Sequence, residues 1–235
     1  MIYDLVMATD GGPPTRTDWA ERLLRDEILT GRLRPGEHLK INVLVDRYDG
    51  LSPTPVREAL SRLAGSGFVE VLPRRGMRVA AASRAELRDL VENRLRLEAA
   101  ALERAVSRGD AAWDALVEAT HHDLGVVSEA ATRTDESAAA RLMAWEEAHR
   151  RFHFALLARC DSPWLLRLIG IVYDNTMRYR WLTLGHDGVR SVASAFERHR
   201  PLLDAAHSRD VEGAVAELRR HTRLTLDSID ELELS

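Results

Sequence analysis

Four histidines in the C-terminal half have the residue type and spacing of a metal site. His149 and His153 stand four residues apart, so on a helix their imidazoles share one face and can chelate one ion. His199 and His221 fall in two later predicted helices, so an internal ion could take three or four imidazoles from three helices. Nitrogen donors of this kind suit Zn²⁺, Ni²⁺ or Co²⁺. Histidines at this spacing are also common as exposed or core pairs, and the pair at 121–122 is expected at the surface.

A second chemically equipped segment, residues 52–63, reads as a helix with a polar face that carries arginine. Ser52 is a good N-cap, and Pro53 suits the first helical position because its missing N–H costs nothing there. The helix start then carries Thr54, Arg57 and the positive end of the helix dipole, which suit phosphates and base edges. The apolar face recurs at three- and four-residue spacing and consists of Val56, Ala59, Leu60 and Leu63.

Two earlier segments complete a helix–turn–helix around this helix. A first helix is expected to begin after Thr17 or Asp18 and to stop at Gly31. A short helix over residues 42–47 follows, and the turn at 48–50 leads into the arginine-bearing helix. The inward-facing residues of the short helix are expected to be Val43 and Leu44.

A basic hairpin is predicted directly after the helix–turn–helix. Residues 68–72 and 77–80 are β-prone and flank a turn that ends in Gly76. A hairpin beside a helix–turn–helix makes a winged helix, in which the inserted helix reads the major groove and the wing holds phosphate or the minor groove. The alternative is a small structural three-helix unit that does not bind DNA and whose arginines face solvent. Residues 54–78 have a charge surplus of +3, from Arg57, Arg62, Arg74, Arg75 and Arg78 against Glu58 and Glu70.

From Ser83 onward the pattern is helical to the end. Ser83 with Glu86 three residues later matches a capping box. No strand-like alternation competes, so the fold class is mainly α: an N-terminal winged helix and a C-terminal all-α bundle of six or seven helices. A break is expected at Gly185 to Gly188. The later helices are predicted near 111–131, 136–159, 163–184, 189–207 and 210–231.

Length and composition set the limits of the interpretation. The 235 residues allow two domains, which we place at 17–80 and 81–235 after a flexible arm at 1–16. No apolar run approaches a membrane span, and one cysteine, Cys160, fits a reducing cytoplasm. The net charge of −4 argues against a uniformly basic coat but not against a local basic surface.

Residues 17–80 closely resemble the DNA-binding domain of GntR-superfamily bacterial repressors. The resemblance is carried by 31–39 (GRLRPGEHL), 52–63 (SPTPVREALSRL) and 75–76 (RG). It implies a double-stranded DNA operator as partner. Many members have arginine where this chain has proline at position 53, so its base-reading set differs from theirs. The predicted DNA-facing residues are Arg34, Asn42, Ser52, Thr54, Arg57, Arg62, Arg74, Arg75 and Gly76.

The helical half resembles the FCD ligand-binding domain of the FadR-type branch. The motifs are 94–98 (RLRLE), Phe152-His153, 197–199 (ERH) and 220–222 (RHT). Metal-binding members supply an aspartate four residues before the central histidine, together with three histidines. The resemblance therefore implies a divalent metal, Zn²⁺ first and Ni²⁺ as the alternative. The implied ligands are His153, His199 and His221, with His149 in the place of the aspartate.

Arg94 resembles the pocket arginine of the same family. The resemblance implies that it pairs bidentately with the carboxylate of a small metabolite effector. The alternative for Arg94 is a surface salt bridge with Glu98, four residues later.

These features together favour a cytoplasmic transcription regulator with no membrane segment and no enzymatic activity. We expect a repressor that binds a palindromic operator as a homodimer and responds to a carboxylate effector near the metal. One alternative is a histidine-ligated metalloenzyme, although no H-E-x-x-H signature is present. The other is a DNA-binding protein with a purely structural metal.

Overall fold

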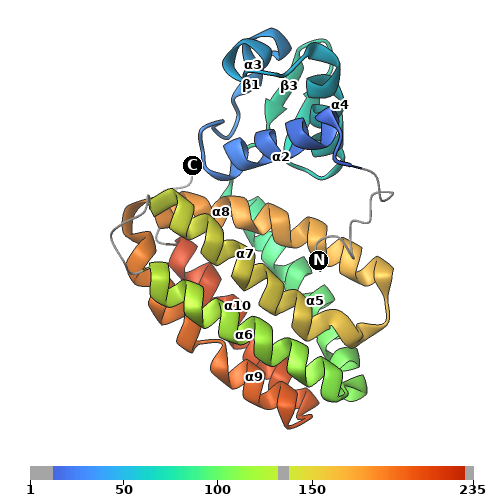
Figure 1. Cartoon of the computed structure of the whole chain (residues 1–235), viewed down its shortest axis with the longest axis vertical. Helices are drawn as coiled ribbons and strands as arrows, with labels where there is room; N and C mark the ends of the chain where they lie inside the picture. The colour runs from blue at the N-terminus through green and yellow to red at the C-terminus, as the bar shows by residue number, and fades with distance from the viewer. Residues whose placement is uncertain (1–12, 132–137, 231–235) are drawn as a thin grey trace.

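The computed structural model describes residues 13–131 and 138–230, and it leaves out the side chains of 138–139, 180–195 and 224–230. Figure 1 shows a small mixed unit above a larger all-helical one. We call residues 13–80 the head and residues 83–230 the bundle. The expected arm at 1–16 falls mostly outside the described residues. Among the described helices, none has both the length and the apolar character that a membrane crossing needs.

The first helix of the head, α2 (Arg16–Leu29), begins earlier than the sequence predicts. Its N-cap is Thr15, which accepts a hydrogen bond from the backbone N–H of Asp18 at 3.1 Å. The Asp18 carboxylate accepts in return from the Thr15 backbone N–H at 2.8 Å, which completes a capping box. The hydrogen bonds from the Thr15 side chain and backbone lower the pKa of Asp18 to about 2. The predicted start after Thr17 or Asp18 is therefore wrong by one turn.

The helix–turn–helix consists of α3 (Ile41–Arg47) and α4 (Pro53–Gly65). The residues of α4 that are buried are the predicted ones, Val56, Ala59, Leu60 and Leu63. In α3, Leu44 is buried as predicted, but Val43 is 55% exposed. The short helix α3 buries Leu44 alone among its described residues, so the prediction for Val43 is wrong.

Ser52 has the extended backbone of an N-cap, but its side chain makes no capping hydrogen bond. A cap hydroxyl accepts from the N–H of the second or third helical residue. The third residue of α4 is Pro55, which has no N–H. The predicted cap bond is therefore absent, and among the described residues the Ser52 hydroxyl has no hydrogen-bond partner.

The wing is a small antiparallel sheet of β1 (His38–Leu39), β2 (Val69–Leu72) and β3 (Gly76–Val79) in the order β1-β3-β2. Leu72 pairs with Gly76, so residues 73–75 form the tip. Arg74 and Gly76 have φ values of 63° and 83°, so the tip turns through the left-handed region, which favours glycine. The predicted hairpin is confirmed, while the two-residue strand β1 was not predicted.

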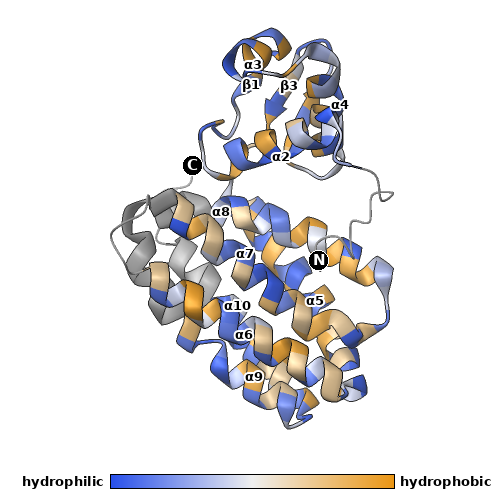
Figure 2. Cartoon of the chain, viewed as in Figure 1, coloured by the Kyte–Doolittle hydropathy of each residue, from blue (hydrophilic) through white to orange (hydrophobic). Residues whose placement is uncertain are grey.

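The bundle confirms the predicted mainly helical fold class. Ser83 caps its first helix by accepting from the Glu86 N–H at 3.2 Å. Its core is separate from that of the head and is built around Leu102, Phe152 and Tyr173. Figure 2 shows apolar and polar residues interleaved along these helices, as in amphipathic packing. The elements are α5 (Arg84–Arg108), α6 (Ala111–Ala131), α7 (Ala138–Leu157), η1 (Ala158–Cys160), α8 (Pro163–Glu197), α9 (Arg200–His207) and α10 (Val211–Asp230).

Helix α8 runs without interruption through Gly185 to Gly188, where the sequence predicts a break. Glycine weakens a helix by only about 1 kcal/mol, which a packed helix tolerates. The chain breaks instead at 198–199, just before Pro201 in the first turn of α9. Proline clashes with the preceding turn and starts a new helix, so Pro201 is the effective stop signal.

Candidate metal centre and DNA-contacting surface

The side chains of His149, His153, His199 and His221 converge at one point in the bundle. Each offers one ring nitrogen, and these four atoms all lie within 4.8 Å of one another. The Nε2 atom of His153 lies 3.1 Å from Nε2 of His149 and 3.3 Å from Nε2 of His199. A tetrahedral ion with metal–nitrogen bonds of about 2.0–2.1 Å keeps its ligand nitrogens about 3.3–3.4 Å apart. The spacing therefore fits donors to one ion.

Three elements bring these imidazoles together. His149 and His153 lie one turn apart on α7, and His221 lies on α10. His199 occupies the turn before α9 as its N-cap residue, and not the interior of a helix as predicted. Three of the residues are at most 2% exposed, while His221 is partly exposed with its Nδ1 buried.

Aromatic side chains orient the imidazoles. The Trp145 ring stacks on His149, with centroids 4.6 Å apart and planes 18° from parallel. The Tyr173 hydroxyl lies 2.8 Å from Nδ1 of His149, which turns Nε2 of that ring toward the other histidines. No carboxylate of a described residue belongs to this group. The donor set is therefore made of neutral nitrogens.

His121 is 6% exposed, so the prediction that it lies at the surface is wrong. Its ring sits between Phe152 and Phe196, with centroid distances of 5.3 and 4.8 Å. Burial lowers the pKa of His121, because removal from water disfavours the charged imidazole. It is a core residue and is not one of the four clustered histidines.

Arg94 forms the predicted pair with Glu98, but the pair is buried and not on the surface. Nε of Arg94 donates to Oε1 of Glu98 at 2.7 Å, and the side chains are 4% and 1% exposed. The guanidinium also lies over the ring of Tyr173, with its carbon 4.2 Å from the centroid. Tyr173 in turn contacts His149, so Arg94 is one aromatic ring away from the imidazole cluster.

The structure separates the arginines of the head into two groups. Arg62 donates to Asp18 at 2.7 Å and to Glu21 at 3.3 Å, and the hydrogen bond with Asp18 raises the pKa of Arg62. Arg78 is held by Glu70, its cross-strand partner, at 2.7 Å. Four of the predicted DNA-facing arginines are exposed and make no ion pair with any described residue: Arg34, Arg57, Arg74 and Arg75.

The DNA-facing residues predicted from sequence lie mainly at the start of α4 and at the wing tip. Ser52, Thr54 and Arg57 lie at the start of α4, and the wing tip carries the 74–76 segment. Asn42 is exposed on α3. Arg62 is half exposed, but it is already neutralised by the acids of α2, which the local sequence does not reveal.

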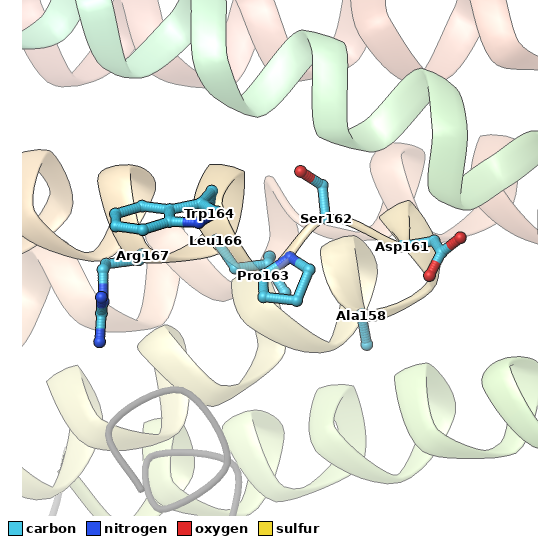
Figure 3. A pocket seen from close by; sticks show the side chains of 7 residues that line it. All are labelled: Ala158, Asp161, Ser162, Pro163, Trp164, Leu166 and Arg167. Atoms are coloured by element: carbon cyan, nitrogen blue, oxygen red, sulfur yellow. The ribbon is translucent and has the colours of Figure 1, made fainter.

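An open surface pocket of about 500 Å³ lies at the start of α8, apart from the clustered histidines (Figure 3). Its lining includes Trp164, and the Arg167 guanidinium lies 5.1 Å from the centre of that ring. Neither Arg94 nor any of the four histidines lines this pocket.

A winged helix with unpaired arginines, joined to a helical bundle with a buried polar cluster, defines a two-unit DNA-binding regulator. Comparison with known families gives the particular one. Residues 17–79 match the family described as "Bacterial regulatory proteins, gntR family", and residues 89–224 match the FCD domain. The chain belongs to the GntR family of transcriptional regulators and carries an FCD domain.

Several known proteins support this assignment. The chain is 37% identical to the HTH-type transcriptional regulator BphR of Paraburkholderia xenovorans, over 90% of this chain and 84% of that protein. It is 34% identical to the HTH-type transcriptional repressor GlaR of Escherichia coli, over 85% and 89%. The solved structure of E. coli McbR/YncC shares the fold, with a TM-score of 0.75, 22% identity and coverage of 92% and 98%. These relatives are transcription regulators and not enzymes.

Proposed function

We propose that this regulator is a cytoplasmic, metabolite-responsive repressor that binds a palindromic operator as a homodimer. Residues 17–80 bind DNA, and residues 81–235 bind a metal and a small carboxylate effector and form the dimer. The proposed metal and effector site is supported mainly by the four histidine ring nitrogens that lie within 4.8 Å of one another. Ring nitrogens buried in a core need hydrogen-bond or metal partners, and one ion could bind a nitrogen of each of the four imidazoles.

The donor set favours zinc, with nickel as the alternative. Neutral imidazoles suit borderline divalent ions and are poor ligands for Mg²⁺ or Ca²⁺. A set without carboxylates leaves the full charge of the ion for an anionic effector to neutralise. Bound there, the metal would act as a Lewis acid toward an effector carboxylate.

Arg94 is the second group that we assign to the effector. In the described structure, the Glu98 carboxylate accepts a hydrogen bond only from the Nε atom of Arg94. The other guanidinium N–H groups are therefore the ones that an effector carboxylate would accept from. The buried Arg94–Glu98 pair would hold the arginine in place before the effector arrives.

We place DNA contacts at Ser52, Thr54 and Arg57, at the start of α4, and at the exposed wing tip; Thr54 and Arg57 are exposed and Ser52 is partly exposed. Replacing Arg57 with alanine should weaken operator binding by about 1–3 kcal/mol if the side chain makes a bidentate base contact. The measurement is a titration of a labelled operator duplex at fixed salt. Arg96→Ala, on the exposed surface of α5, is the control and should leave the affinity unchanged. Unchanged affinity in Arg57→Ala would remove this residue from the interface.

A homodimer is required because one winged helix reads only a short half-site. Helix α8 exposes Trp164, Leu168 and Ile171, which are 69%, 46% and 40% exposed and whose i, i+4, i+7 spacing places them on one side of the helix. Pairing two copies along α8 would set two heads side by side. A patch of this kind is a common self-association surface.

Trp164→Glu should convert the dimer into a monomer, because it puts a charge into a buried apolar contact. Light scattering coupled to size-exclusion chromatography measures the mass directly. The matched control is Val126→Glu, which changes an apolar residue of α6 that is also 53% exposed. A Trp164→Glu protein that remains fully dimeric would place the interface elsewhere.

Recovery of chromosomal fragments with the purified protein tests the regulator as a whole. We expect a small set of discrete sites that share an inverted repeat. Failure to recover any discrete locus would reject operator binding. Metal removal and a metabolite screen that both leave DNA affinity unchanged would favour a purely structural metal.

A further inference from the structure

Asp174 on α8 of the bundle binds two arginines, Arg25 of the head and Arg150 of the bundle. Its Oδ2 accepts from Nη1 of Arg25 on α2 at 2.9 Å, and its Oδ1 accepts from Nε of Arg150 on α7 at 3.1 Å. The three side chains are only 11–17% exposed. Solvent and salt screen such charges weakly, and Glu21 on α2 also binds Arg25, at 3.1 Å. The triad is therefore a firm joint between the two units.

The residues just before two members of this joint belong to the metal centre. His149 precedes Arg150 on α7, and Tyr173 precedes Asp174 on α8. The Tyr173 hydroxyl lies 2.8 Å from Nδ1 of His149. Consecutive residues of a helix point about 100° apart, so each helix presents one residue to the imidazoles and the next to the joint. A helix movement that repositions His149 must therefore move the joint as well.

A second contact joins the end of α4 to the same part of α8. The Asn175 side-chain N–H₂ donates to the backbone carbonyl of Ser66 at 2.7 Å, and Ser66 is the C-cap of α4. The next residue, Gly67, has φ of 84°, and a Cβ there would lie 3.1 Å from Oδ1 of Asn175. Both the conformation and the close approach favour glycine. The end of α4 thus rests directly on α8.

We propose that metal binding at the four histidines and DNA binding by the head are linked through these adjacent residue pairs. The inference rests on the proposed metal site and adds the route by which that site acts on the head. Packed helices move between discrete arrangements, so a small change at an imidazole is passed on and not absorbed. The metal is then an allosteric ligand of the DNA-binding unit.

The linkage is measured with Zn²⁺ alone and a duplex that carries a chromosomal site recovered by the full-length protein. The dissociation constant of the duplex is determined for zinc-free and zinc-loaded protein at one ionic strength. The zinc affinity is then determined with and without the duplex. Because linkage is reciprocal, we expect both ratios to be equal and to differ from one by at least about 5-fold.

Asp174→Asn keeps the side-chain shape and removes the charge that holds both arginines. We expect it to bring both ratios to about one while each ligand still binds. Arg25→Gln should also bring both ratios to about one while it leaves the Arg150–Asp174 pair intact. It therefore tests the linkage independently if Asp174→Asn misfolds. Asp114→Asn is the matched control, because that aspartate pairs with Arg209 at 2.8 Å elsewhere in the bundle. It should keep the wild-type ratios.

The outcomes separate this inference from the proposed function. Wild-type protein that binds no zinc, or no chromosomal site, rejects the proposed function and the linkage with it. Wild-type protein that binds both with ratios of one rejects the linkage alone. Wild-type ratios retained in folded Asp174→Asn and Arg25→Gln proteins reject the route through Asp174.

Discussion

Replacing His153 and His221 together with alanine is expected to abolish stoichiometric zinc binding. The double variant loses two of four nitrogen donors, including the one closest to its neighbours, at 3.1 and 3.3 Å. Two remaining imidazoles cannot close a tetrahedral site, and metal affinity depends on the number of preformed ligands. Elemental analysis by mass spectrometry after dialysis gives the metal content per chain. Calorimetric titration gives the affinity.

The exposed His122 provides the control for this experiment, since His122→Ala removes an imidazole from the same bundle without touching the cluster. It should retain one ion per chain. A His149→Asp variant should also retain the ion, because a carboxylate is a good zinc ligand at that position. Full metal content in the His153/His221 double variant would reject the proposed site.

Glu98→Gln is expected to lower the free energy of unfolding by about 3–5 kcal/mol, because it leaves the guanidinium of Arg94 buried without its counter-charge. The two side chains are 4% and 1% exposed, so water cannot replace the lost carboxylate. Urea unfolding followed by circular dichroism gives the difference.

The same helix supplies a matched comparison for that prediction. Glu92 pairs with Arg96 at the same i,i+4 spacing, but those side chains are 64% and 71% exposed. Glu92→Gln should therefore change stability by no more than about 0.5 kcal/mol. Equal effects of the two substitutions would show that burial does not strengthen the Arg94–Glu98 pair.

Local patterns predicted the helix–turn–helix and the wing of the head. The apolar spacing of α4 identified its four buried residues, and the turn residues before Gly76 identified the wing. Ser52 is the N-cap of α4 as predicted, but its predicted side-chain hydrogen bond is absent, and Pro55, three residues on, lacks one of the N–H groups that could donate to the hydroxyl. That signal was present in the sequence. Pro201 was a similar signal, and it marks the end of α8 better than the glycines at 185–188.

Contacts between distant segments could not be predicted in the same way. Arg62 belongs to the basic surplus of residues 54–78, but acids on α2 neutralise it. The sequence gives no sign that Phe152 and Phe196 enclose His121, or that Asp174 lies between two arginines. The sequence grouped the four histidines by spacing and by resemblance, and only the fold brings one ring nitrogen of each within 4.8 Å of the others.

Helix α8 spans 35 residues, or about 52 Å at the rise of an α-helix. Its first part carries the exposed side chains of Trp164, Leu168 and Ile171. Residues 173–175 follow and contact His149 and the head. The helix ends two residues before His199. Adding or deleting one residue within it would turn everything beyond that point by about 100°. Side chains along α8 can therefore be exchanged individually, but a change in the length of the helix would alter how its exposed apolar residues, its head contacts and His199 are oriented relative to one another.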